Sequence, residues 1–94
     1  MPSAHASVET ENASKYVAQL CKHFGHKIDV YYADDNAECR FPFGSATLMA
    51  RENEFVVNVE AAEQDNLLRL KKVIEDHLLR FAFRENLPSL SWSA

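Results

Sequence analysis

The chain has 94 residues, the size of one small domain, and we predict a single domain over residues 1–94. The net charge is −4, and Lys and Arg form no block. A protein that binds nucleic acid or an anionic membrane needs a basic face, so neither is expected as a partner. No apolar run approaches the roughly 20 residues that span a bilayer, and the first residues lack the features of a signal peptide. We therefore expect a cytoplasmic protein with no membrane partner.

The first two predicted elements are a strand and a helix. Residues Ala4–Glu9 alternate small or apolar side chains with polar ones, which is typical of a strand with one covered face. Asn12 is a candidate N-cap for the helix that follows, and Gly25 is expected to end that helix in the left-handed conformation. The apolar residues at helical spacing between them are Ala13, Tyr16, Val17, Leu20 and Phe24.

Four short alternating segments come next, at residues 28–32, 37–41, 46–50 and 55–59, and turn-forming residues separate them. Short loops between such segments predict an antiparallel meander with one face covered. The opposite face is either plain solvated surface or a shallow binding or pairing face. Its predicted members are Asp29, Tyr31, Glu38, Arg40, Thr47, Met49, Val56 and Asn58.

A long helix is predicted from about Ala62 to Glu85, with an apolar stripe of Leu67, Leu70, Ile74, Leu78 and Phe81. It would be about 36 Å long, so its end should extend beyond the sheet or bend. Residues 89–92 are predicted to form a short edge strand. The order β-α-β-β-β-β-α, with an optional final strand, predicts a two-layer α+β domain in which two helices cover one face of the antiparallel sheet. This topology resembles one repeat of the TATA-box-binding-protein fold, a likeness that implies no function.

Histidines lie on both predicted helices, in residues 21–27 and 77–85. Cys21, His23 and His26 are residue types that bind metals, although their spacing is not that of a zinc finger. One interpretation is a partial metal or cofactor site completed by His77. The other places His23 at a helix C-terminus, where a cation is favoured, and Cys21 at the edge of the core. No cofactor is evident, and the identity of any metal stays open.

The second histidine segment adds arginines close to His77. Imidazole and guanidinium groups together are suited to an anionic ligand such as a carboxylate or a catecholate. The alternative for His77 is a half-buried ring with one nitrogen bonded to a neighbour. The candidate ligand-binding residues are His23, His26, His77, Arg80, Arg84 and Glu85.

A second apolar strip follows the long helix through Leu68, Leu79 and Phe83, away from the core stripe. Such a strip indicates a partner surface, and the simplest partner is a second copy in a twofold homodimer. A C-terminal tail that folds back and carries Trp92 would cover the same strip. Both interpretations stand at this point.

Catalytic signatures are absent from the sequence. The only glycines are Gly25 and Gly44, so there is no phosphate-binding glycine loop, and neither a G-x-S-x-G nor an H-E-x-x-H motif occurs. We therefore assign no catalytic residues and favour a protein that is not an enzyme.

Three segments, Leu20–Lys27, Phe41–Gly44 and His77–Glu85, resemble the signature segments of a small bacterial family catalogued as domain of unknown function 2218. The resemblance extends over nearly the whole chain. It implies a compact bacterial domain without an assigned activity. Members of that family occur near, or joined to, siderophore-interacting flavin reductases, which implies a role in iron uptake and a siderophore-interacting reductase as a partner in a separate chain. Two hypotheses follow: a non-enzymatic ligand-binding or accessory domain linked to iron and siderophore handling, or a homodimeric structural module without a small-molecule ligand.

Overall fold

The computed structural model describes residues 2–82 and 90–93. Its elements follow the predicted order β-α-β-β-β-β-α. They are β1 (Ser3–Glu9), α1 (Ala13–Phe24), β2 (Asp29–Ala33), β3 (Asn36–Phe41), β4 (Gly44–Arg51), β5 (Glu54–Glu60) and α2 (Gln64–Phe81).

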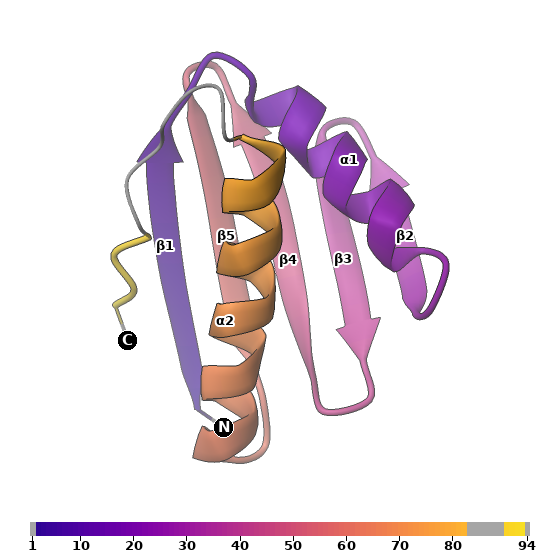
Figure 1. Ribbon diagram of the computed structural model, residues 1–94, viewed down its shortest axis with the longest axis vertical. Coiled ribbons are helices and arrows are strands. Elements are labelled where there is room, and N and C mark those ends of the chain that lie inside the picture. Colours follow the sequence, from indigo (N-terminus) through magenta and orange to yellow (C-terminus); the bar gives the residue numbers. More distant parts are fainter. Residues whose placement is uncertain (1, 83–89, 94) are drawn as a thin grey trace.

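The five strands form one antiparallel sheet in the spatial order β1-β5-β4-β3-β2. Both helices lie on the same face of this sheet (Figure 1). The predicted two-layer α+β class is therefore confirmed. The first strand pairs with the last one, which leaves β1 and β2 at opposite edges of the sheet.

Two-residue turns connect β2 to β3, β3 to β4 and β4 to β5. In the first of these turns Asp34 and Asp35 both have positive φ, at 49° and 64°. Two consecutive residues of this kind form a type I′ turn, whose twist matches that of the adjoining strands. Aspartate tolerates this left-handed region better than most residues, because its short polar side chain can bond locally. The turn fixes the register of β2 on β3, with Ala33 opposite Asn36.

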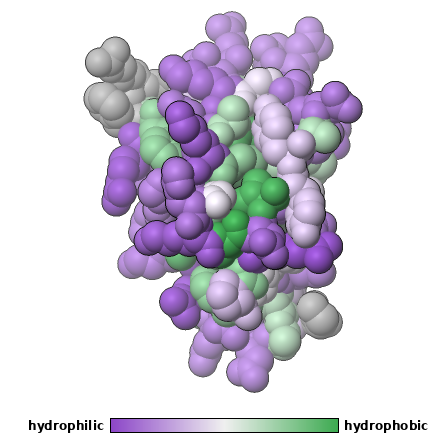
Figure 2. Space-filling model, turned by 90° about the vertical axis from the view of Figure 1, so that its right-hand side faces the viewer, coloured by the Kyte–Doolittle hydropathy of each residue, from purple (hydrophilic) through white to green (hydrophobic). Residues whose placement is uncertain are grey.

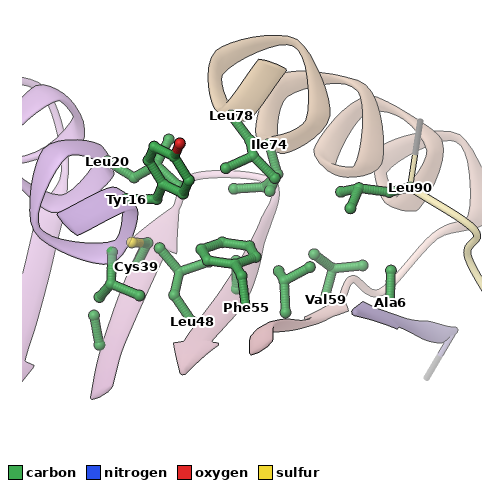
Figure 3. Packing of buried hydrophobic residues seen from close by; sticks show 14 of the residues in the cluster. Ala6, Tyr16, Leu20, Cys39, Leu48, Phe55, Val59, Ile74, Leu78 and Leu90 are labelled. Carbon is green, nitrogen blue, oxygen red and sulfur yellow. The ribbon is translucent and has the colours of Figure 1, made fainter. Parts of the chain in front are cut away.

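The core lies between the sheet and the two helices (Figure 3). Burial in β1 alternates strictly, and only its small inward side chains are covered, as the sequence pattern predicts. Full burial of each large apolar side chain contributes roughly 1.5–3 kcal/mol, so the largest ones carry most of the stability. The largest fully buried side chains include Leu20, Leu48, Phe55, Leu70, Ile74 and Leu78.

Two local predictions need correction. The second helix ends at Phe81 rather than near Glu85, so it has 18 residues and a length of about 27 Å. Gly25 does end α1, but with φ −60° and ψ −15°, so the predicted left-handed cap is wrong. The reason is that the chain continues in a right-handed turn. The N–H of Gly25 donates to the carbonyl of Cys21, and that of Lys27 donates to the carbonyl of Phe24.

The C-terminal tail runs beside β1, at the left of Figure 1. Instead of the predicted edge strand, residues 90–93 make a single antiparallel bridge, in which the N–H and C=O groups of His5 and Ser93 exchange bonds of 2.8 and 2.9 Å. Residue 89 of the predicted strand lies outside the described residues. Neither of the described helices is both long and apolar enough to cross a bilayer.

Candidate functional site at the histidine pair

The imidazole rings of His23 and His77 lie side by side, with 4.7 Å between their centres and an angle of 45° between their planes. His23 is in the last turn of α1, and His77 is one turn before the end of α2. The two helices contact each other on the same face of the sheet. This contact brings together two histidines that are 54 positions apart in the sequence. The histidine pair is therefore a product of the tertiary fold.

An aromatic cluster of Phe24, Phe41, Phe43 and Phe81 adjoins the histidine pair. The ring of Phe24 lies 5.2 Å from that of His77 and 5.3 Å from that of Phe41, both edge to face. The ring of Phe81 lies 5.9 Å from that of His23. Aromatic rings prefer such edge-to-face contacts at these separations, so the cluster holds both imidazoles in place. The sequence pattern predicted core positions for Phe24 and Phe81 and did not indicate that these four phenylalanines adjoin the histidines.

One nitrogen of His77 has a defined role. Its Nδ1 lies 2.7 Å from the carbonyl oxygen of Val73, one helical turn earlier. A carbonyl can only accept, so Nδ1 carries the proton and donates it. In the neutral ring this leaves Nε2 with a lone pair, available as an acceptor or as a ligand. The side chain is half-buried, as its place at the edge of the apolar stripe predicts.

The surroundings of His23 are electropositive. The pKa of this imidazole is lowered from 6.5 by partial burial and then, in decreasing order, by the charges of His77, Lys27, Arg80 and His26. Each of these groups makes a further positive charge on His23 unfavourable. The same groups would attract an anion to the histidine pair.

The other candidate ligand residues have different positions. His26 is exposed in the turn after α1 and makes no ring contact with the pair among the described residues. Arg80 is exposed on α2, close enough to His23 to affect its pKa. Arg84 and Glu85 lie outside the described residues. The assignment of these six residues to a ligand site therefore stays a prediction.

Cys21 belongs to the core and not to the histidine pair. Its side chain is buried, and its thiol neighbours that of Cys39 on β3. Across the described residues no group of three or more His, Cys, Asp or Glu side chains is arranged to hold a metal ion. A structural zinc site takes four ligands, and the histidine pair offers two. The metal-site interpretation of the first histidine segment thus has no support from the geometry.

The second apolar strip is partly covered. Trp92 of the tail donates from Nε1 to a carboxylate oxygen of Glu75 at 3.2 Å, and Glu75 precedes Leu79 by one helical turn. Leu79 is half-buried, whereas Leu68 is 53% exposed. The third member, Phe83, lies outside the described residues. The tail therefore lies beside one part of the strip and leaves Leu68 accessible.

A wide hollow on the described surface does not include the histidine pair. It has a volume of about 800 Å³ and lies between the β1–α1 and β4–β5 connections. Glu9, Glu11, Glu52 and Glu54 are among its lining residues, so it would repel an anion. The pair lies instead on the helical layer of the molecule, near the cations described above.

Fold and site together define a small α+β domain in which two histidines from different helices meet beside aromatic rings and cationic side chains. The chain belongs to the family described as "Uncharacterized protein conserved in bacteria (DUF2218)", whose model matches residues 5–93. It is also similar to a solved structure, "NMR structure of PA4090 from Pseudomonas aeruginosa". The two are 31% identical, with a TM-score of 0.84, and the match covers 99% of this chain and 96% of the other. A comparison with curated proteins found no match. The predicted family is thus confirmed.

Proposed function

We propose that this domain is a non-enzymatic binding protein that takes a small anionic, aromatic ligand at the histidine pair. The observation that carries the proposal is the 4.7 Å separation of the His23 and His77 rings inside a group of positive charges. Neutral packing alone would not require Lys27 and Arg80 to lie close enough to His23 to affect its pKa. The pKa of His23 is lowered first by burial and then by neighbouring positive charges, and a bound anion would offset those charges.

The chemistry of the site favours a flat ligand with an acidic edge. The phenyl and imidazole faces can stack on an aromatic ring. Arg80 and Lys27 can pair with a carboxylate or a catecholate, and Nε2 of His77 can bond to a hydroxyl group. Aryl carboxylates and catechols combine these features in one small molecule.

Iron uptake is a cellular process in which a ligand of this class would occur. The family resemblance implies proximity to siderophore-interacting reductases, and catecholate siderophores carry an anionic aromatic group of the kind described. In this proposal the domain presents or retains such a ligand for a reductase in a separate chain. The iron itself would be cargo carried by the ligand and not a resident metal of the protein.

The test is an NMR titration of ¹⁵N-labelled protein with 2,3-dihydroxybenzoate and with its diamagnetic gallium complex. We expect saturable shifts centred on the amides near His23 and His77, and an upward shift of the His23 pKa. His77→Phe keeps a ring in the aromatic cluster but removes Nε2, and Arg80→Gln removes one cation. Both should weaken binding by roughly tenfold, which corresponds to the loss of one hydrogen bond.

Lys72→Gln is the matched control, because Lys72 is also an exposed cation on α2 and is absent from the groups that act on His23. It should bind like the wild type. Absence of saturable shifts with both compounds at millimolar concentration would refute the proposal, and so would equal weakening by Lys72→Gln and Arg80→Gln.

A homodimeric interaction module is the second candidate function, and the exposure of Leu68 favours it. In this case the apolar strip of α2 would lie at the twofold interface. Light scattering of the wild type and of Leu68→Glu tests it. Loss of a dimer in the variant would support the strip as the interface, whereas a monomer in both would remove this candidate.

A further inference from the structure

The two edges of the sheet differ in how they are covered. Edge strands present unpaired backbone groups, and natural proteins protect them with lysine, proline, a bulge or a covering segment. The β1 edge has the tail beside it, through the bridge between His5 and Ser93. The β2 edge has no backbone partner except β3 within residues 2–82 and 90–93. Its five residues, Asp29–Ala33, include no lysine, proline or bulge.

The type I′ turn determines which backbone groups of β2 are open. In such a turn the carbonyl of the first residue, Ala33, accepts from the N–H of the fourth, Asn36. Ala33 therefore directs its backbone groups toward β3. The backbone N–H and C=O groups of successive residues in an antiparallel strand point alternately to one side and the other. Those of Tyr32 and Val30 therefore point away from β3, toward the open edge. Each of these two residues thus offers one donor and one acceptor at the open edge.

Apart from Asp29, the side chains of β2 are apolar or aromatic. Tyr31 and Tyr32 are 57% and 47% exposed, the largest exposed aromatic residues of the described chain. Figure 2 faces this side of the molecule and shows a hydrophobic patch amid hydrophilic surface. Beside the patch is a shallow hollow of about 330 Å³, lined by Val30 and Tyr32 with Ala18, Cys21, Lys22 and Gly25.

We propose that a second copy of the chain pairs at this edge, β2 against β2, antiparallel and about a twofold axis through Tyr31. The two five-stranded sheets would then form one continuous sheet of ten strands. Val30 of each copy lies opposite Tyr32 of the other, so the outward donors and acceptors satisfy one another in two reciprocal pairs. The Tyr32 ring of one copy falls beside Val30 of the other, next to the hollow under α1.

Charges at the two ends of β2 fit this antiparallel arrangement. With the axis at residue 31, a residue n positions before it lies opposite the residue n positions after it in the second copy. Within the strand, Asp29 lies opposite the uncharged Ala33. Lys27 is in the turn before β2 and Asp35 is in the turn after it, so the antiparallel arrangement brings the Lys27 end of one copy to the Asp35 end of the other, twice by symmetry. Within one copy Lys27 and Asp35 stand at opposite ends of β2, about 17 Å or more apart, where salt screens their interaction. This complementarity is realised only between copies.

The expected dimer is reversible, because a five-residue strand pair with its bordering side chains is smaller than a standard interface. Sedimentation equilibrium and NMR rotational correlation times between 20 µM and 1 mM would measure it. We expect the wild type to dimerise in this range. Tyr32→Pro removes one outward N–H and no bond to β3, so it should weaken the dimer by more than roughly 100-fold while the fold persists.

A double-mutant cycle tests the register. Lys27→Glu converts two attractive pairs into repulsive ones and should weaken the dimer roughly tenfold. Asp35→Asn removes the partner charge at a position where asparagine tolerates the positive φ. In the double variant the effect of Lys27→Glu should largely disappear. A nonzero coupling between residues this far apart in one copy supports β2 pairing.

Three outcomes would overturn the proposal. One is a wild-type protein that stays monomeric at 1 mM. Another is a dimer that Leu68→Glu abolishes and Tyr32→Pro leaves intact, which would move the interface to α2. The third is strict additivity of Lys27→Glu and Asp35→Asn, which would remove the twofold axis from Tyr31. Circular dichroism and an amide spectrum of each variant separate loss of pairing from loss of fold.

Discussion

The thiols of Cys21 on α1 and Cys39 on β3 are neighbours in the core, and each affects the pKa of the other. Both side chains are buried. Burial raises the pKa of Cys21, and burial together with the neighbouring Cys21 and Glu38 raises the pKa of Cys39 to about 12. Because a thiolate is the reactive form of cysteine, this pair is chemically protected in the folded protein.

The first prediction concerns that protection. At pH 8 the native protein should react with Ellman's reagent far more slowly than a free thiol does, and Cys39 should react only as the protein unfolds. In guanidinium chloride both thiols should react at once. The variant Cys21→Ser isolates Cys39 for this measurement. Rapid modification of Cys39 in native conditions would contradict the assigned burial.

The second prediction concerns Gly44, at the start of β4. A Cβ there would lie 2.5 Å from the Cδ1 atom of Leu70 and 2.6 Å from the carbonyl oxygen of Glu60. Both are closer than van der Waals contact permits, so Gly44→Ala must displace the end of β5 or the first part of α2. We expect a loss of about 1–3 kcal/mol in the free energy of unfolding, measured with urea. An unchanged midpoint would mean that Leu70 moves aside freely.

Element order and burial pattern could be predicted because they depend on local spacing. Alternation in β1 and the stripe of α2 through Leu70 and Ile74 each appear in sequence as a period. The histidine pair could not be derived in this way. Its existence depends on the distance between α1 and α2, which depends in turn on how side chains of both helices fill the space over the sheet. No period in the sequence encodes that distance.

The ends of elements were harder to predict for a related reason. Gly25 was expected to be left-handed because glycine usually is at a helix end. The position at which β2 must begin determines whether the turn after the helix is left-handed or right-handed. That position is a property of the whole fold. The open edge of β2 likewise follows from strand order, since any strand of a meander can be central or peripheral.

The third prediction concerns pH. The pKa of His23 in the folded protein is lowered from 6.5, so between the two values the unfolded chain binds more protons. The contribution of neutral His23 to the free energy of unfolding is fully present above pH 6.5. It declines as the pH falls through 6.5 toward the pKa of the folded state. The variant His23→Gln should therefore lose less stability than the wild type between pH 7.5 and 5.5. Urea midpoints across that range measure the difference. Parallel profiles for the two proteins would contradict the assigned environment.

The fourth prediction concerns the tail. Trp92 is the single tryptophan of the chain and donates to the carboxylate of Glu75. Glu75→Gln replaces a charged acceptor with a neutral one and should cost about 1 kcal/mol or less, because the bond is only partly buried. Iodide should quench Trp92 fluorescence more strongly in this variant, since the tail detaches more often. The exposed neighbour Asp76, changed to Asn, serves as the control and should leave quenching unaltered.

The two-residue turns of the sheet have a consequence for how the chain reaches its fold. From β2 to β5 each strand pairs with the next one along the chain, so these contacts close only short loops. β1 is different, because it pairs with β5 and closes a loop that includes α1 and three strands. Loop-closure entropy therefore favours early formation of the meander and late arrival of β1. Substitutions such as Val8→Ala should accelerate unfolding and leave the folding rate nearly unchanged. Until β1 arrives, β5 is itself an unpaired edge.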